Sequence, residues 1–226
     1  SAVVSNFVTF FGAGILNDSG TSIINQSTFT GNTTGAAGAD GAMGNYATLV
    51  VNQCTLAGNS APYAAGIFNG SSLTLSNSIV AGNTPDDLNN GGSITATGVN
   101  LTNGVPLLAP LGNYGGPTPT MPPLPGSPAI NGCTSGSSFA TDQRGAGFLR
   151  PIGPFADIGA VEVQAPVVLN TLSSGVGSLR DAISNAPAGA IITFSNNLSG
   201  ATILLTNGQI TLNQSLTLDA SALPAG

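Results

Sequence analysis

NQSTFTGN at residues 25–32 recurs as NQCTLAGN at 52–59 and as SNSIVAGN at 76–83. Each copy is a short stretch of alternating apolar and polar residues that ends at a Gly-Asn turn. A repeat of about 25 residues, built from short strands without helices between them, is typical of a parallel β-solenoid. The sequence therefore predicts an all-β fold, a right-handed parallel β-helix in which each repeat is one coil.

Equivalent positions of the repeat predict the interior and one corner of the coils. The apolar position should stack inward from coil to coil, and it is occupied by Phe29, Leu56 and Val80. A glycine then precedes the last residue of each copy, because the chain must turn with a positive φ. The last residue can stack its side-chain amide on the next coil as a structural ladder, and it is occupied by Asn32, Asn59 and Asn83.

Composition restricts the partners of this chain. Among its 226 residues there is no Lys or His, only three Arg, and the net charge is −6. Such a surface repels phosphate, which excludes nucleic acid and anionic membranes as expected partners. No apolar run reaches the length of a membrane span, so membrane insertion is not expected, and no secretory signal is present. If the protein is exported, the chain is expected to be a mature fragment.

The order of segments predicts three regions. Residues 1–84 form the coils, and residues 85–165 form an irregular, Pro- and Gly-rich closing segment with further strands, expected to wrap a face or an end of the solenoid because proline cannot continue a ladder. Residues 166–226 carry one short capping helix and three alternating strands, AIITFS, ATILLT and QITLNQSLTLDA. The residues that define this helical cap are Ser178, Leu179, Arg180, Asp181 and Ile183, with Ser178 as the N-cap.

These motifs resemble a family of bacterial surface proteins. GSLRDAI at 177–183, the glycine-led coils of 12–83, ATDQRGAGFLRP at 140–151 and DIGAVE at 157–162 are similar to motifs of the choice-of-anchor Q β-helix proteins, which are akin to polymorphic outer-membrane-protein repeats. The resemblance implies an extracellular, cell-surface β-helix more than any activity. Family members begin with the GSLRDAI cap and end with the closing motifs, whereas here the cap follows the closing motifs.

The displaced cap suggests how the protein is used. The coils near Val3 have no cap before them, and the capped strands after Val167 stop after too few coils, so each end lacks what the other has. We expect an extracellular structural or adhesive filament built by head-to-tail stacking, either of separate subunits or of tandem repeats. The predicted assembly interface comprises Val3, Val4, Phe7, Phe10, Phe11, Ile15, Ile203, Leu205, Ile210, Leu212, Leu216 and Leu218.

Two alternatives stay open at this stage. In one, the tail returns along the whole stack and caps its own first coil. In the other, the chain is an isolated cell-surface module that binds or acts on carbohydrate, with surface polysaccharide as the partner in place of a second copy of the protein.

The sequence offers little catalytic chemistry, so we do not expect an enzyme or a cofactor. Asp86 and Asp87 are the only adjacent acids; they are weak candidates for calcium because a site needs six or more oxygen ligands. Arg144 and Arg150 are expected to pair with Asp142 and Asp157.

Four further features have a structural and a functional interpretation. Cys54 and Cys133 are either small buried residues or one disulfide bridge, and 35–44 is read as an insertion loop rather than a calcium repeat. A threonine face for ice or crystal binding would start at Thr28 and Thr30. Candidate glycan acceptors in Asn-x-Ser/Thr triplets are Asn17, Asn25, Asn32, Asn69, Asn100, Asn197 and Asn213.

Overall fold

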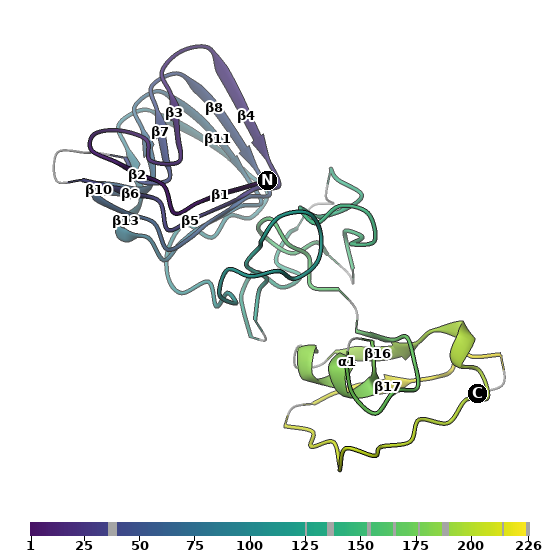
Figure 1. Cartoon of the computed structure of the whole chain (residues 1–226). Coiled ribbons are helices and arrows are strands. Elements are labelled where there is room, and N and C mark those ends of the chain that lie inside the picture. The colour runs from purple at the N-terminus through teal and green to yellow at the C-terminus, as the bar shows by residue number, and fades with distance from the viewer. Residues whose placement is uncertain are drawn as a thin grey trace. The chain divides into compact units, whose positions relative to one another are not determined.

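The computed structural model describes residues 1–35, 40–124, 126–134, 138–152, 155–164, 166–175, 177–186, 190–213 and 215–224 (Figure 1). The chain divides into two compact units, which we call the coil unit, Ser1–Val163, and the opening unit, Gln164–Gly226. The predicted all-β parallel β-helix fold with one short α-helix is confirmed.

The coil unit is wound from three sheets, and all strand pairs in them are parallel (Figure 1). The first sheet contains β1 (Ala2–Val4), β5 (Thr28–Thr30), β9 (Thr55–Leu56) and β12 (Ile79–Val80). The second contains β2 (Phe7–Val8), β6 (Thr33–Thr34), β10 (Ser60–Asn69), β7 (Met43–Asn45), β3 (Ile15–Asn17) and β13 (Thr84–Asn90). The third contains β4 (Thr21–Asn25), β8 (Thr48–Asn52), β11 (Ser72–Ser76) and β14 (Ser93–Thr97).

The predicted apolar stack forms the centre of the coil unit. Phe29, Leu56 and Val80 are buried in one cluster and occupy paired positions on β5, β9 and β12. Inward-facing leucines and valines of the third sheet complete this cluster, because side chains alternate across each strand. The glycines at the predicted turn have φ values of +67°, +70° and +79° at Gly31, Gly58 and Gly82, as the sequence predicts.

The number of residues per coil decreases toward one end of the stack. On the third sheet Asn25 of β4 pairs with Asn52 of β8, and these two asparagines lie 27 residues apart. Asn52 pairs in turn with Ser76 of β11, and Ser76 with Thr97 of β14, where the separation has fallen to 21 residues. The coils therefore become shorter toward the end at which β13 and β14 lie.

Residues 98–163, which we call the wrapping segment, contain no named helix or strand in their described part and cover one face of the coils. Leu101 pairs with Ile79, and Ala129, Cys133, Ala156 and Ile158 form a second apolar cluster with Ile79 and Ala81. The proline-rich chain therefore packs on the solenoid, but it begins later than the predicted residue 85, because β13 and β14 continue the coils to Thr97.

The wrapping segment also argues against the alternative of a threonine face for ice or crystal binding. Thr28 and Thr55 point outward from the first sheet but are buried, because the wrapping segment lies over them. The hydroxyl of Thr28 donates to Gln143 Oε1 at 2.7 Å, and the hydroxyl oxygen of Thr55 accepts from the Ala160 amide at 3.0 Å. This face is an internal contact, so ice or a crystal surface cannot reach it.

The opening unit is a short parallel sheet with a helix beside it. Its elements are β15 (Val167–Val168), α1 (Leu179–Asn185), β16 (Ile191–Phe194), the 3₁₀ turn η1 (Asn196–Leu198) and β17 (Thr217–Asp219). The expectation of a strand at ATILLT is wrong, because residues 201–206 form no ladder. In the described part of the last predicted strand only Thr217–Asp219 is paired. A strand persists only where a neighbouring strand takes up its backbone groups.

Candidate functional site

The predicted asparagine ladder is present and is longer than the sequence repeat indicated. The side-chain amide of Asn6 donates to Asn32 Oδ1 at 2.8 Å, Asn32 donates to Asn59 Oδ1 at 2.9 Å, and Asn59 donates to Asn83 Oδ1 at 2.8 Å. Each of these oxygens also accepts the backbone N–H of the preceding asparagine, at 3.0 to 3.3 Å. The ladder therefore runs in one direction, with its donors toward the later coils.

Asp87 occupies the last position of this ladder. Its Oδ1 accepts the side-chain amide of Asn83 at 2.9 Å and the backbone N–H of Asn83 at 2.8 Å, so the carboxylate replaces the amide oxygen of a further coil. Asp86 is exposed on the same strand, β13. Among the described residues no three His, Cys, Asp or Glu side chains are grouped for a metal ion. The geometry thus assigns Asp87 to the ladder rather than to calcium.

A second ladder, which the sequence analysis missed, lies on the second sheet. It joins the side chains of Asn17, Asn45, Asn69 and Asn90 at 2.7 to 2.8 Å. The sequence does indicate this ladder, because the strand that precedes each turn of the repeat ends in an asparagine, at ILN, MGN and IFN. Because Asn17, Asn32 and Asn69 are buried in the two ladders, they are not accessible as glycan acceptors, whereas Asn25, Asn197 and Asn213 are exposed.

The first coil, residues 1–27, supplies the outermost strand at one side of each sheet of the coil unit. Within the described chain β1, β2, β3 and β4 each pair on one side only. Large apolar side chains are exposed beside these edges: Phe7 (69%), Phe10 (59%), Phe11 (50%), Leu16 (46%) and Ile23 (61%). The first three were predicted and the last two were not. Three further residues of the predicted interface are partly buried; they are Val3, Val4 and Ile15.

Charge is nearly absent from this end of the molecule. Asp18 is the only charged side chain between residues 1 and 35. Charged residues on edge strands normally prevent other chains from pairing with them. The first coil therefore has open backbone groups and exposed apolar side chains without this protection.

The opening unit also has a core that is covered on one side. Val168, Ala182 and Ile192 are buried, and the predicted interface residues Ile203, Ile210 and Leu216 are only partly buried against them. A groove of about 360 Å³, lined in part by Ile183, Ile210 and Leu216, opens beside the helix. The remaining predicted interface residues of this unit, Leu205, Leu212 and Leu218, are exposed. Leu204, which was not predicted, is exposed as well.

The helical cap forms as the sequence predicts. Ser178 Oγ accepts the Asp181 amide at 3.1 Å, which is the N-cap bond, and the Asp181 carboxylate accepts the amide of Gly177, one residue before the N-cap, at 2.8 Å. Ile183 is buried and Leu179 packs beside it. Arg180 donates to the carbonyls of Ser173, Asn207, Gly208 and Gln209, and so ties the helix to the extended chain.

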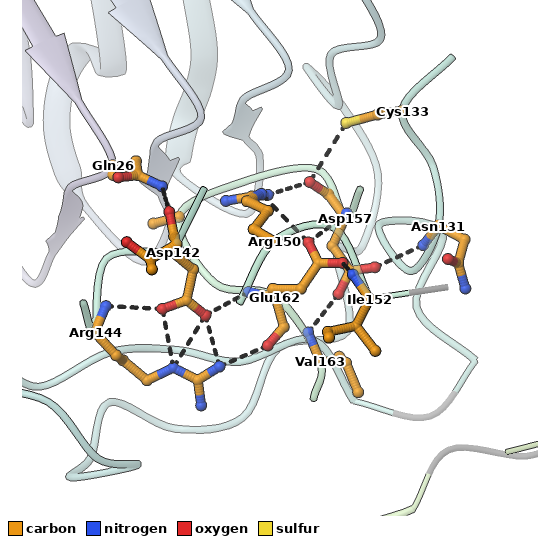
Figure 2. Close-up of polar contacts among 12 residues, drawn as sticks. Gln26, Asn131, Cys133, Asp142, Arg144, Arg150, Ile152, Asp157, Glu162 and Val163 are labelled. Atoms are coloured by element: carbon orange, nitrogen blue, oxygen red, sulfur yellow. Dashed lines mark hydrogen bonds and ion pairs between the residues drawn. The ribbon is translucent and has the colours of Figure 1, made fainter. Parts of the chain in front are cut away.

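A buried ionic cluster holds the wrapping segment together (Figure 2). Arg144 pairs with Asp142 as predicted, and the shortest distance between their side chains is 2.6 Å. Arg144 also donates to the backbone carbonyl of Glu162 at 2.6 Å. The prediction for Arg150 is wrong in part: its ionic partner is Glu162, with Nε and Oε2 3.3 Å apart, and it reaches only the backbone carbonyl of Asp157. The sequence analysis missed Glu162, the only glutamate in the chain.

The carboxylates of Glu162 and Asp157 accept hydrogen bonds from backbone amides. Glu162 accepts the amides of Ile152 at 2.7 Å and Asp157 at 2.9 Å, and Asp157 accepts those of Asn131 at 2.7 Å and Val163 at 2.6 Å (Figure 2). Burial raises the pKa of Glu162 to about 7 and also raises the pKa of Asp157. Because these groups bind one another and the backbone, the cluster fixes the path of the chain.

The two cysteines are free, so of the two interpretations offered by the sequence they are small buried residues and not a disulfide bridge. Both are buried, and burial raises the pKa of Cys54 to about 12 and that of Cys133 to about 11. Cys54 occupies the position shared with Ser27 and Ser78, whose hydroxyls bond the backbone of the same corner. The thiols are therefore packing residues and weak nucleophiles.

Asp40 is an isolated buried acid in the predicted insertion loop, of which residues 36–39 lie outside the described residues. Tyr46 donates to its Oδ2 at 3.3 Å, and burial raises the pKa of Asp40 to about 6. Its other oxygen has no partner among the described residues. One acid with a tyrosine holds no metal ion by itself.

Helices long and apolar enough for a membrane span are absent from the described residues. Comparison with models of protein families, with curated proteins and with solved structures finds no match for this chain.

Proposed function

We propose that the protein is an extracellular structural protein that builds adhesive filaments by stacking β-helix units on one another. One observation carries this proposal: a group of exposed phenylalanines lies on and beside strands that pair on one side only within the described chain, with almost no charge near them. An edge of this kind is a template for another chain. Continued stacking would satisfy its backbone groups and bury its apolar side chains together.

Two features of the chain support the proposal. The amide ladders hold coils in register through neutral hydrogen bonds, which suits a fibre whose coils repeat over long distances. The resemblance to surface β-helix proteins favours an extracellular location, where a sparsely charged, Asn- and Thr-rich surface can serve association.

The test is the state of the purified full chain over a range of concentrations, followed by light scattering and electron microscopy. We expect fibres from the wild-type protein and monodisperse particles from the double variant Phe7→Asp/Phe11→Asp. Both side chains are exposed, so the charges leave the core intact and act on the edge alone.

Tyr63→Asp is the matched control, because Tyr63 is equally exposed (65%) but lies on β10, away from the first coil. It should form fibres like the wild type. A wild-type protein that stays monomeric at every concentration would contradict the proposed function.

A further inference from the structure

Independently of the proposed function, we infer that Asn103 is a site of spontaneous modification, at which the side-chain amide is converted to aspartate and isoaspartate in the folded protein. The chain contains five Asn-Gly pairs, which begin at Asn69, Asn90, Asn103, Asn131 and Asn207. Glycine has no side chain to hinder its nitrogen, so this dipeptide is the one that deamidates most readily in a free chain. The structure restrains four of the five pairs and leaves one open.

Deamidation begins when the nitrogen of the glycine attacks the side chain of the asparagine before it. The Gly104 nitrogen loses its proton and forms a bond to Cγ of Asn103, the Cγ–Nδ2 bond breaks, and ammonia leaves with that proton. Water then opens the five-membered imide at one of its two carbonyls. Opening at Cγ gives aspartate and opening at the main-chain carbonyl gives isoaspartate, without oxidation or reduction. The glycine N–H must therefore be free of a hydrogen bond, and the asparagine must be free to turn.

Two of the pairs lie in the second ladder, where the glycine amides are engaged. Gly70 N–H donates to the Asn45 carbonyl at 2.8 Å, and Gly91 N–H donates to the Asn69 carbonyl at 2.8 Å. The side chains are held as well, because Asn69 Nδ2 donates to Asn90 Oδ1 at 2.7 Å. Asn69 is paired with Asn45 on one side and with Asn90 on the other. Attack at either pair therefore requires the coils to open locally.

The pair that begins at Asn131 is held inside the wrapping segment. Gly132 N–H donates to the Ala129 carbonyl at 3.1 Å, and Asn131 N–H donates to the Asp157 carboxylate at 2.7 Å. A Cβ atom on Gly132 would lie only 2.7 Å from Ile158 Cδ1, so this part of the backbone is closely packed. Although Asn131 is exposed, its glycine nitrogen is not free to attack.

The pair Asn207 and Gly208 has a free glycine amide but a fixed asparagine. Among the described residues no acceptor for the Gly208 N–H is found. Asn207 Nδ2, the atom that would leave, donates to Ser174 Oγ at 2.7 Å, and the backbone N–H of Asn207 donates to Ser173 Oγ at 2.9 Å. Arg180 donates to the carbonyls of both residues of the pair. These contacts oppose the rotation that the attack requires.

Asn103 and Gly104 have none of these restraints. Both are exposed, in a bend of the coil unit that follows Leu101. In the described part of the chain no hydrogen bond involves the side chain of Asn103 or the N–H of Gly104, and the space around Gly104 is open, since a Cβ atom there would meet nothing within 4 Å. Deamidation thus falls on an exposed loop and spares the ladders, in which a carboxylate could not donate to the next coil.

Site-resolved mass spectrometry of the full chain tests this assignment. The protein is incubated in a mildly alkaline buffer and digested, and each pair is followed through the mass gained when an amide becomes an acid; electron-transfer fragmentation separates aspartate from isoaspartate. In the folded protein Asn103 should convert about tenfold faster than Asn69, Asn90 and Asn131, because those three sites react only through local opening. Asn207 should be intermediate. In concentrated urea all five should convert at similar rates, because the contacts are lost.

Asn103→Gln is the matched variant, because it keeps an amide at an exposed position but closes the corresponding six-membered ring far more slowly. It should remove the early conversion and leave the other four sites, the internal controls, unchanged. The inference is wrong if any of those four sites converts as fast as Asn103 in the folded protein. It is also wrong if Asn103 stays intact in the folded protein while it converts in urea.

Discussion

At the scale of single residues, the coils are held in register by side chains that both donate and accept. An asparagine can accept the amide of the coil before it and donate to the coil after it, so identical residues form a continuous chain of hydrogen bonds. Asp87 can only accept, which is why an aspartate is suited to the last position. Asp86, one residue earlier, has an exposed side chain and no such contact in the described structure.

Replacing Asp87 with alanine should therefore lower the free energy of unfolding by about 1 to 3 kcal/mol, because the buried amide groups of Asn83 lose their acceptor. Urea unfolding of the coil unit in the full chain measures the change. Asp87→Asn keeps an acceptor oxygen and should lose less. Asp86→Ala is the control and should stay within about 0.5 kcal/mol of the wild type; equal losses from Asp86→Ala and Asp87→Ala would refute the assignment.

At the scale of elements, the wrapping segment replaces regular secondary structure by buried polar contacts. It covers the outer face of the first sheet, and its own path is fixed by Asp142, Arg144, Arg150, Asp157 and Glu162. Burial disfavours the charged form of Glu162, and its ion pair with Arg150 offsets this cost only in part. The stability of this element therefore depends on the protonation of its acids.

Glu162 should make the coil unit less stable as the pH rises. Its pKa is about 7 in the folded chain, above the value of 4.5 in the unfolded chain, so the folded state binds the extra proton. The stability it contributes is complete below pH 4.5 and is lost as the pH rises through 7. Between pH 6 and 8 the free energy of unfolding should fall by about 1 to 2 kcal/mol.

Chemical denaturation at pH 6, 7 and 8 measures this fall. Glu162→Gln has no proton to lose and should lack most of it, whereas the exposed control Asp86→Asn should retain it. Asp40, with a pKa of about 6, is half ionised at pH 6 and contributes a smaller part of the fall, which Glu162→Gln should keep. An unchanged fall in Glu162→Gln would assign the pH dependence to another group.

At the scale of the whole molecule, the chain contains two cores of unequal quality. The coil unit has a long apolar cluster inside the coils and a second one under the wrapping segment, whereas the opening unit has one small cluster with many large apolar side chains exposed around it. Small units bury a smaller fraction of their surface and are less stable. The opening unit should therefore be the weaker of the two.

Calorimetry of the monomeric Phe7→Asp/Phe11→Asp variant should show two transitions, with the opening unit unfolding first. Ile192→Ala, at a buried position of the opening unit, should lower only the first transition, and Leu56→Ala, buried in the coil unit, only the second. Each substitution should cost about 2 to 5 kcal/mol in its own unit. A single transition that both substitutions shift would show that the units unfold together.

The sequence by itself determined the coils, the inward stack of Phe29, Leu56 and Val80, the glycine turns, the ladder through Asn32, Asn59 and Asn83, and the Ser178 cap. All of these follow from local patterns, because a repeat places equivalent residues one coil apart. The second ladder left only a weak signal, since its asparagines end strands whose lengths differ between coils.

Only the tertiary structure decided what the aperiodic part of the chain does. Residues 98–163 have no repeat, so nothing local showed that Glu162 pairs with Arg150 or that Thr28 and Thr55 are covered. Asp87 follows the last copy of the repeat, so no equivalent residue indicated that it ends the ladder. ATILLT has a strand pattern but no neighbour to pair with, and a pattern alone does not form a ladder. These outcomes depend on which distant segments meet, and hence on the packing of the whole chain.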